Sequence, residues 1–440
     1  MFKPASYFSA LMFCAAASSA AALPLATEGA QTCCIVRSFP APEPVCFAAD
    51  ELQRFLWEIT GVCPYVRKSP MGGKRTNIVL ACPDAWATAN PETFTQDLQA
   101  IGDTDGFAVR TIRNTVYIVA NEPKGVLNGV YDFLERNTDI VFHRPNAQPI
   151  YGHTPNLTAK HADYRQVPAF IQRGFQINVD QQYEPSELWL ARNRNNTTAA
   201  PEQFRDNRLK YGMWQSYGGG HNLKRWIPPQ VYGESNPDFF PMIDGKRNVN
   251  GHNQLCFTNP RLLDEMTRLV LEQISLAPSP TYYKTYNIMT EDCNGLCECP
   301  QCLAPIKLPD GALLPPDDPS FRSTQHYIFM NEVARRVTAI HPKVKINTYA
   351  YSWSVTPPKI ELLPSVTARF CTVMKNDKES INGPSNAKWL DLTTRWIRQK
   401  ANLVWREYYG LGARFCRPVA EVVAEDLRTI LALGINRAFS

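Results

Sequence analysis

Two segments of the chain place carboxyl side chains directly after an apolar, strand-like run. Glu291 and Asp292 follow residues 284–290, and Glu407 follows residues 401–406. Two carboxyl groups that flank a glycosidic bond can cleave it, because one protonates the leaving oxygen while the other activates water or attacks the sugar. Acid/base hydrolysis of a sugar linkage is therefore the first chemistry that these residues suggest.

The two carboxyl segments also have structural alternatives. Consecutive strand residues point to opposite sides, so we expect only one of Glu291 and Asp292 to face a shared site. The other reading of Asp292 is a helix cap or a loop anchor, because Asn294 and a glycine follow it. Glu407 stands between apolar and aromatic residues, where burial would raise its pKa and suit it to general acid catalysis. Its alternative is an ion pair with Arg406 or another cation.

Two kinds of side chain near these segments are candidates for binding a sugar. His221 follows three glycines, 218–220, in a loop that can approach a ligand closely. Aromatic side chains alternate at 349, 351 and 353 and flank Glu407, and flat aromatic faces stack well on sugar rings. Alternating aromatics also occur in cores, so we select the last of each run, Trp353 and Tyr408. The alternative for His221 is packing within its loop.

Cysteines are concentrated beside Asp292. Cys293, Cys297, Cys299 and Cys302 lie within ten residues, and Cys256 is an alternative partner to Cys293. Four close sulfurs suit a tetrahedral structural zinc, whereas two disulfides are the competing interpretation for an exported chain. We favour the disulfides slightly, and free thiols are the third reading. In the first two cases the cluster would brace the loop that carries the carboxyl groups.

The elements that position these residues follow a repeating strand–helix pattern after about residue 168. Alternating strands and helices predict a parallel sheet, and seven or eight such units predict a (β/α)8 barrel. An open doubly wound sheet is the alternative, although no Gly-x-Gly-x-x-Gly motif follows an early strand. We expect strands at residues 171–179, 209–215, 284–290, 345–351, 366–372, 401–407 and 435–439. The chain ends directly after the last of these, so we expect the closing helix to be missing through truncation.

The part before the barrel divides into three segments. Residues 1–22 have one charge followed by an apolar, alanine-rich run, which predicts a secretory signal peptide. Residues 24–147 combine helical and strand patterns, including a helix near 48–59 and a hairpin around Asn114, and predict a small α/β sandwich domain. The proline-rich segment 148–167 is the expected linker, and residues 168–440 form the barrel.

The net charge and the apolar pattern of the chain indicate its cellular compartment and argue against one class of partner. The net charge of +5 on 440 residues argues against a nucleic-acid binder, which normally carries a strong basic excess. No later stretch is apolar enough for a membrane helix, so we expect a secreted or periplasmic protein; a membrane-anchored N-terminus is the alternative. Of the 13 cysteines, Cys14 would be removed with the signal peptide. The even number that remains is compatible with disulfides in an oxidising compartment.

Several motifs resemble known families. The runs "AADELQRFLWEITG" (48–61) and "GFAVRTIRNTVYIVANEPKGVLNGVYDFLE" (106–135) are similar to the domain that precedes the barrel in α-glucuronidases and family 20 β-hexosaminidases. The runs "NPDFFPMIDGKR" (236–247), "QLCFTNPRLL" (254–263) and "EDCNGLCECPQC" (291–302) resemble the bacterial domain of unknown function 4838. Cys293 stands where that family usually has glycine, and Glu291 where asparagine is common.

The resemblance implies roles for particular residues. Asp292 matches the family motif, which makes it the preferred catalytic carboxyl group with Glu407, and Glu291 a further candidate. The run around Arg173 is similar to the first barrel strand of family 20 enzymes, where an arginine binds the sugar hydroxyls; a barrel-bottom ion pair is its alternative. The order Glu291-Asp292 reverses the acidic pair of that family.

Together these features lead us to expect an exported glycoside hydrolase that acts on an oligo- or polysaccharide and requires no cofactor. Two alternatives stay open. One is a non-catalytic carbohydrate-binding protein on a glycosidase scaffold. The other is a polysaccharide lyase that uses His221 and a tyrosine.

Overall fold

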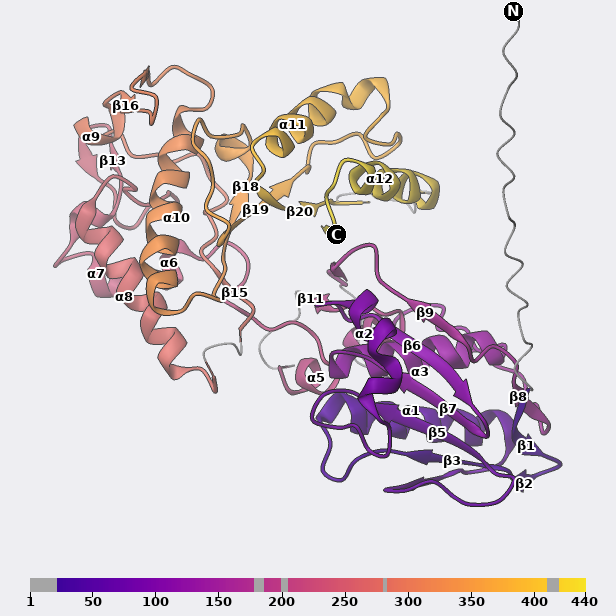
Figure 1. Cartoon of the computed structure of the whole chain (residues 1–440). Coiled ribbons are helices and arrows are strands. Elements are labelled where there is room, and N and C mark those ends of the chain that lie inside the picture. The colour runs from indigo at the N-terminus through magenta and orange to yellow at the C-terminus, as the bar shows by residue number, and fades with distance from the viewer. Residues whose placement is uncertain (1–21, 178–185, 199–204, 280–282, 410–418) are drawn as a thin grey trace, which may run out of the picture.

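The computed structural model describes residues 22–177, 186–198, 205–279, 283–409 and 419–440, without the side chains of 205 and 206. The predicted signal peptide, apart from Ala22, lies outside the described residues. Two lobes follow each other along the chain (Figure 1). Among the described helices, none combines the length and apolar character needed to cross a membrane.

The N-terminal lobe is a mixed sheet packed against helices, as expected. The order of its main sheet is β4-β3-β5-β7-β6-β9, and a smaller sheet has the order β2-β1-β8. The strands are β1 (Leu23–Thr27), β2 (Ala30–Gln31), β3 (Cys33–Val36), β4 (Tyr65–Arg67), β5 (Thr76–Ala81), β6 (Phe107–Ile112), β7 (Thr115–Val119), β8 (Leu157–Ala159) and β9 (Tyr164–Gln166). The helices are α1 (Glu43–Thr60), α2 (Thr95–Ile101) and α3 (Pro123–Asn137).

The apolar periodicity of α1 explains why it forms and where it packs. Ala48, Leu52, Phe55 and Ile59 recur at helical spacing and are fully buried in the core that α1 shares with α3. Gly61 ends the helix in the left-handed conformation, with φ of 74°, which glycine adopts without strain. The predicted hairpin around Asn114 is present as the antiparallel pair β6–β7.

The proline-rich segment 148–167 differs from the prediction. It is not a free linker, because β8 pairs with β1 and β9 pairs with β6 within it. Both strands are only three residues long, too short to produce a readable alternation of apolar residues. The segment therefore completes the sheets of the N-terminal lobe before the chain enters the second lobe.

The second lobe contains the eight parallel strands of a curled, barrel-like sheet. Its order is β11-β10-β21-β20-β19-β18-β15-β12. In chain order this is 2-1-8-7-6-5-4-3, the circular order of a (β/α)8 barrel. A backbone hydrogen bond of 2.7 Å from Trp214 N to Asn196 O bridges the remaining gap between the segments of β11 and β12. The strands are β10 (Gln172–Phe175), β11 (Thr197–Thr198), β12 (Ser216–Tyr217), β15 (Thr285–Asn287), β18 (Ile346–Ala350), β19 (Val366–Cys371), β20 (Asn402–Arg406) and β21 (Arg437–Phe439).

Helices alternate with these strands along the chain. The longer ones are α8 (Pro260–Leu276), α10 (Phe321–Ile340), α11 (Ala387–Arg398) and α12 (Ala420–Ala432). Shorter ones are α4 (Ser186–Arg192), α5 (Arg205–Lys210), α6 (Leu223–Trp226), α7 (Pro229–Tyr232) and α9 (Pro300–Leu303). Short hairpins are formed by β13 (Met242–Ile243) with β14 (Lys246–Arg247) and by β16 (Ile306–Lys307) with β17 (Leu313–Leu314).

The third strand was predicted in the wrong place, and the second was not predicted. Residues 209–215 include the end of α5 and a turn at Gly212, whose φ is 63°, and the strand is the two-residue β12 that follows. Two-residue strands leave almost no pattern in a sequence, which explains both errors. The other six predicted strands coincide with observed ones.

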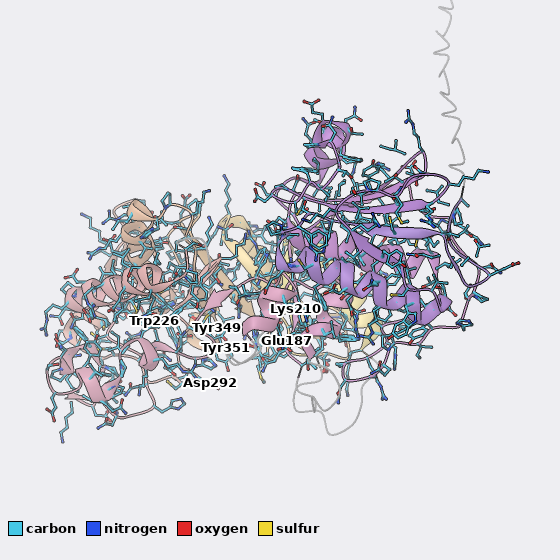
Figure 2. The ribbon with its side chains drawn as sticks, turned by 90° about the horizontal axis from the view of Figure 1, so that it is seen from below. Glu187, Lys210, Trp226, Asp292, Tyr349 and Tyr351 are labelled. Atoms are coloured by element: carbon cyan, nitrogen blue, oxygen red, sulfur yellow. The ribbon has the colours of Figure 1, made fainter. Side chains whose placement is uncertain are left out.

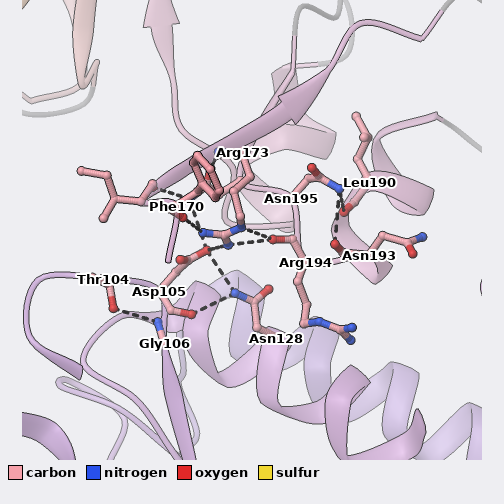
Figure 3. Close-up of polar contacts among 12 residues, drawn as sticks. Thr104, Asp105, Gly106, Asn128, Phe170, Arg173, Leu190, Asn193, Arg194 and Asn195 are labelled. Atoms are coloured by element: carbon pink, nitrogen blue, oxygen red, sulfur yellow. Dashed lines mark hydrogen bonds and ion pairs between the residues drawn. The ribbon is translucent and has the colours of Figure 1, made fainter. Parts of the chain in front are cut away.

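Arginines from the start of the second lobe join the two lobes. Arg173 Nη2 lies 2.6 Å from Asp105 Oδ2, and Arg192 Nε lies 3.0 Å from Glu51 Oε2. Arg194 forms a further ion pair with Glu135. Figure 3 shows Arg173 directed at Asp105, while the backbone carbonyls of Phe170 and Arg194 accept its other N–H groups. The lobes are therefore held by paired charges as well as by shared apolar packing.

We expect Arg192→Met to lower the free energy of unfolding by about 3–5 kcal/mol, because it leaves the buried Glu51 carboxylate without its closest cation. The matched control is Arg54→Met, which removes a partly exposed partner of the same carboxylate and should cost less than about 1 kcal/mol. Urea denaturation of both variants measures the difference. Equal losses would contradict the importance of the buried pair.

Candidate active site

The loops after β12 and β15 and the carboxyl end of β18 bring a histidine, an acidic side chain and two tyrosines together. Tyr351 Oη donates a hydrogen bond of 2.9 Å to Asp292 Oδ1. The ring of His221 lies 5.2 Å from that of Tyr349 and 6.0 Å from that of Tyr351. Figure 2 shows Asp292 beside these tyrosines. We call Asp292, His221, Tyr349, Tyr351 and Tyr408 the mouth site.

The remaining member, Tyr408, enters from β20. Its ring packs with Tyr351 against a buried group formed by Met289, Tyr349 and Cys371. Burial raises the pKa of Tyr351 to about 12, and its hydrogen bond to Asp292 adds to that effect. Tyr351 is therefore a neutral donor at ordinary pH, and it orients the exposed Asp292 carboxyl group.

Glu291 serves a different purpose from its neighbour. Its Oε1 accepts a hydrogen bond of 3.0 Å from the backbone N–H of Lys224 in α6. Helix N-termini have unpaired N–H groups, so this contact is a cap rather than an approach to the mouth. The expectation that only one of Glu291 and Asp292 faces the site agrees with this geometry, and Asp292 is the one that does.

Two arginines that were not singled out from the sequence lie beside the mouth site. The guanidinium carbons of Arg369 and Arg406 lie 5.6 Å and 4.9 Å from the ring centre of Phe439. Arg406 donates to the hydroxyl of Tyr408 at 3.0 Å and to Gln176 at 3.3 Å, whereas Nε of Arg369 is buried without a hydrogen-bond partner. Neither forms an ion pair with a carboxylate among the described residues. Burial lowers the pKa of Arg369, and the charge of Arg406 adds to this effect.

The position of these arginines within apolar strand segments could have identified them from the sequence. Arg369 stands inside the apolar strand β19, and Arg406 ends β20. An arginine within a buried strand needs a carboxylate or a ligand. Because alternate residues share a face, both point to the same side of the sheet as Cys371 and Tyr408.

Glu407 does not join Asp292. Its Oε2 accepts a hydrogen bond of 2.8 Å from Thr372, and its Oε1 accepts one of 2.9 Å from the backbone N–H of Tyr408. Lys375 Nζ lies 3.6 Å from Glu407 and 3.1 Å from Asp426 of α12. One residue along β20 reverses the side-chain direction, so Glu407 faces this buried ion cluster and not the mouth. The expected acid/base pair is therefore not assembled. The alternative for Glu407, an ion pair with Arg406 or another cation, is the one observed, and Lys375 is the cation.

Two predicted sugar-binding residues also lie elsewhere. The guanidinium of Arg173 makes four hydrogen bonds, to Asp105, Phe170 and Arg194, at the junction of the lobes, which corresponds to the structural alternative of an ion pair. Trp353 packs edge-on against His326 at 5.5 Å and against Phe257 at 6.2 Å, in the layer between β18 and α10. Of the four predicted binding residues, His221 and Tyr408 belong to the mouth site.

The cysteine cluster forms without disulfides. Cys256, Cys297, Cys299 and Cys302 converge, with their sulfurs all within 4.8 Å of one another, whereas Cys293 stays outside. The 11 cysteines in the described part of the chain are all free, so the preferred expectation of two disulfides is wrong. The sulfur separations exceed the roughly 2.05 Å of a disulfide bond.

Comparison with known protein families gives two matches along the chain. Residues 149–440 match the family described as a domain of unknown function, DUF4838, and residues 27–133 match the glycosyl hydrolase family 67 N-terminus. The chain belongs to the domain of unknown function 4838 family. The resemblance inferred from the motifs is thus confirmed. No curated protein matches the chain.

A solved structure with a TM-score above 0.5 supports the fold. A family 115 4-O-methyl-α-glucuronidase with specificity for decorated arabinogalactans superposes with a TM-score of 0.57 at 13% identity, over 95% of this chain and 54% of that enzyme. The chain thus spans about half of that enzyme's length. A family 20 β-N-acetylhexosaminidase from Streptomyces coelicolor has a TM-score of 0.48 at 13% identity, over 88% of this chain and 72% of the other. The first of these similarities shows a glycosidase-like barrel fold.

Glu407 gives this family member a specific pH dependence of stability. Burial raises the pKa of Glu407 from 4.5 to about 7, despite the opposing charge of Lys375. The folded state thus binds this proton more tightly than the unfolded chain, so the contribution to stability is complete below pH 4.5 and is lost as pH rises to about 7.

We expect the free energy of unfolding of the wild type to fall over that interval, relative to Glu407→Gln, by on the order of 3 kcal/mol. Glutamine mimics the neutral carboxyl group and does not titrate. Urea denaturation of both proteins across the interval measures the difference. Parallel pH profiles would show that Glu407 does not titrate in this range.

Proposed function

We propose that this protein is an exported glycoside hydrolase whose substrate carries a negatively charged sugar, such as a uronic acid, in an oligo- or polysaccharide. The single observation that carries the proposal is the combination at one barrel mouth of exposed Asp292 with Arg369 and Arg406, for which the described part of the chain offers no carboxylate partner. Export follows from the predicted signal peptide, and no cofactor is needed for the reaction.

The arginine pair supports the anionic substrate. Two guanidinium groups lie within 5.6 Å of the centre of the Phe439 ring and repel each other, and burial adds a desolvation cost. A carboxylate bound between them would offset both effects through charge-assisted hydrogen bonds. Arg406 is already held by Tyr408 and Gln176, so it is preorganised for such a ligand. The glycosidase with which this chain shares its fold is named as a glucuronidase, which agrees with this choice.

Asp292 is the group proposed to move the proton. Its carboxyl group gives a proton to the leaving oxygen as the glycosidic bond breaks, and water adds to the anomeric carbon and returns a proton to the carboxylate. One water is consumed and Asp292 is regenerated. Tyr351 holds the carboxyl group in place through the hydrogen bond to Oδ1. The rings of Tyr408 and His221, which are only partly buried, supply faces against which a sugar can pack.

A polysaccharide lyase is the second candidate, because one observation favours it specifically. Lyases abstract a proton beside a uronic acid carboxylate, which requires neutralisation of that carboxylate and a base such as histidine or tyrosine. The ring of His221 lies next to the rings of Tyr349 and Tyr351. The product separates the two: elimination leaves an unsaturated sugar that absorbs ultraviolet light, and hydrolysis does not.

We expect Asp292→Asn to lower kcat for uronic acid oligosaccharides by about 10²–10⁴-fold, because asparagine keeps the hydrogen bond from Tyr351 but cannot exchange the proton. Glu407→Gln is the matched control and should retain most of the activity, since its side chain faces the Lys375 cluster. Reducing-end release is the measurement.

Two results would contradict the hydrolase assignment. One is turnover by Asp292→Asn at the wild-type rate with the fold intact. The other is sugar binding by the wild type without turnover of any uronic or neutral oligosaccharide, which would favour a carbohydrate-binding protein. A product that absorbs in the ultraviolet would favour the lyase.

The choice of sugar is tested by Arg406→Gln. We expect kcat/KM for a uronic acid substrate to fall about 10- to 100-fold, the value of a hydrogen bond to a charged group, while kcat/KM for the matching neutral sugar changes little. Arg428→Gln, on the exposed face of α12, is the control. Equal losses of kcat/KM for both sugars would mean that the arginine pair stabilises the barrel and does not recognise the negative charge of the substrate.

A further inference from the structure

The four converging cysteines come from two segments that are distant in the sequence. Cys256 precedes α8, and Cys297, Cys299 and Cys302 lie in the loop and short helix that follow Asp292. Each of the four is at most 3% exposed. Four buried thiols gathered from separate segments, with Met242 as their partly buried apolar neighbour, form a closed and compact group.

The sulfur separations match one coordination geometry. Cys256 Sγ lies 3.5 Å from Cys297 Sγ, 3.8 Å from Cys299 Sγ and 3.7 Å from Cys302 Sγ. A tetrahedral zinc with Zn–S bonds of about 2.3 Å requires sulfur pairs about 3.8 Å apart. A disulfide would require roughly 2.05 Å.

The groups around the sulfurs are those that stabilise thiolates. The backbone N–H of Met242 in β13 donates to Cys297 Sγ at 3.2 Å, and Arg247 in β14 directs Nη1 at the same sulfur from 3.8 Å. Thr258 Oγ1 lies 3.0 Å from Cys302 Sγ. A tetrathiolate zinc centre carries a net charge of −2, so N–H and O–H donors and a nearby guanidinium offset that charge.

We propose that Cys256, Cys297, Cys299 and Cys302 bind one structural Zn²⁺. All four tetrahedral positions are filled by protein sulfur, which leaves none open for water or substrate, so the site has no catalytic role of its own. Cys293 is not a ligand: its sulfur accepts a hydrogen bond from Gln254 Nε2 at 3.3 Å and lies outside the group.

The location of this site gives the zinc a positioning function. Gln254, two residues before the ligand Cys256, donates hydrogen bonds of 2.8 Å to the backbone carbonyls of Glu291 and Cys293. Its Oε1 accepts the backbone N–H of Glu291 at 3.0 Å. These three bonds hold the backbone on both sides of Asp292. The zinc ties the segment of Gln254 to the loop that continues from Asp292, so it fixes the backbone that presents this carboxyl group at the mouth.

The test is metal analysis of the full chain purified with reducing agent and without chelator. We expect about one zinc per chain, and titration with a mercurial should release it as four thiols react. Cys299→Ser should lose the zinc, whereas Cys293→Ser in the same loop should keep it. The mercurial titration uses wild-type protein, so it decides the question even if Cys299→Ser fails to fold.

A second measurement tests the positioning function and does not depend on catalytic activity. Removal of zinc from the folded wild type should raise amide hydrogen exchange in the peptide around Glu291 and Cys293 and leave exchange in β5 unchanged. Unchanged exchange at 291–293 would overturn the positioning function.

Three results would overturn the zinc assignment. These are iron with sulfide in place of zinc, a thiol count that shows two disulfides, or four free thiols in protein without metal. None of them bears on the hydrolase proposal, which rests on Asp292 and the arginine pair.

Discussion

The parallel pairing of β10 with β21 joins the first and last strands of the barrel, and the mouth site depends on it. Gln172, Arg173 and Gly174 pair with Arg437, Ala438 and Phe439. Gly174 permits the approach of the neighbouring strand β11, because a Cβ there would lie 2.2 Å from the carbonyl oxygen of Thr197. The same pairing places Phe439 under the guanidinium groups of Arg369 and Arg406. Closure of the sheet thus creates the floor of the site.

Alternation along the strands then separates two groups of charges. On the inner side, Arg406 and Tyr408 face the mouth together with Arg369. On the outer side, Glu407 meets Lys375 and Asp426 between the sheet and α12. A single residue along β20 separates the two environments. The outer group is internally paired, whereas the inner arginines have no carboxylate partner among the described residues.

The loop after β15 joins the barrel to its surroundings through three different contacts. Glu291 caps α6, Asp292 reaches Tyr351 of the neighbouring strand segment, and the cysteines that follow converge with Cys256. The loop is therefore held at both ends and at its centre. Exposed loops are usually the most mobile parts of a barrel, and a carboxyl group that must be placed accurately needs such support.

Much of the architecture could be predicted from the sequence, because local periodicity of apolar residues determines it. The helix beginning near 48, the hairpin at Asn114, six of the eight barrel strands and the succession of two domains follow from spacing and turn residues. The sequence did not predict strands β11 and β12 or the strand pairing within residues 157–166. Elements of two or three residues are too short to show a periodic pattern of apolar residues.

The sequence by itself determined which residues could do chemistry: the Glu291-Asp292 pair, His221, the aromatic runs and the clustered cysteines. Only the tertiary structure decided which of them meet. Asp292 accepts a hydrogen bond from Tyr351, whereas Glu407 forms an ion pair with Lys375. Arg173 pairs with Asp105 of the other lobe, and the fourth member of the cysteine cluster is Cys256, not Cys293. The physical reason is that residue type and spacing are local properties. Side-chain direction at the end of a strand, and the partner that a buried charge finds, depend on how distant segments close around the barrel.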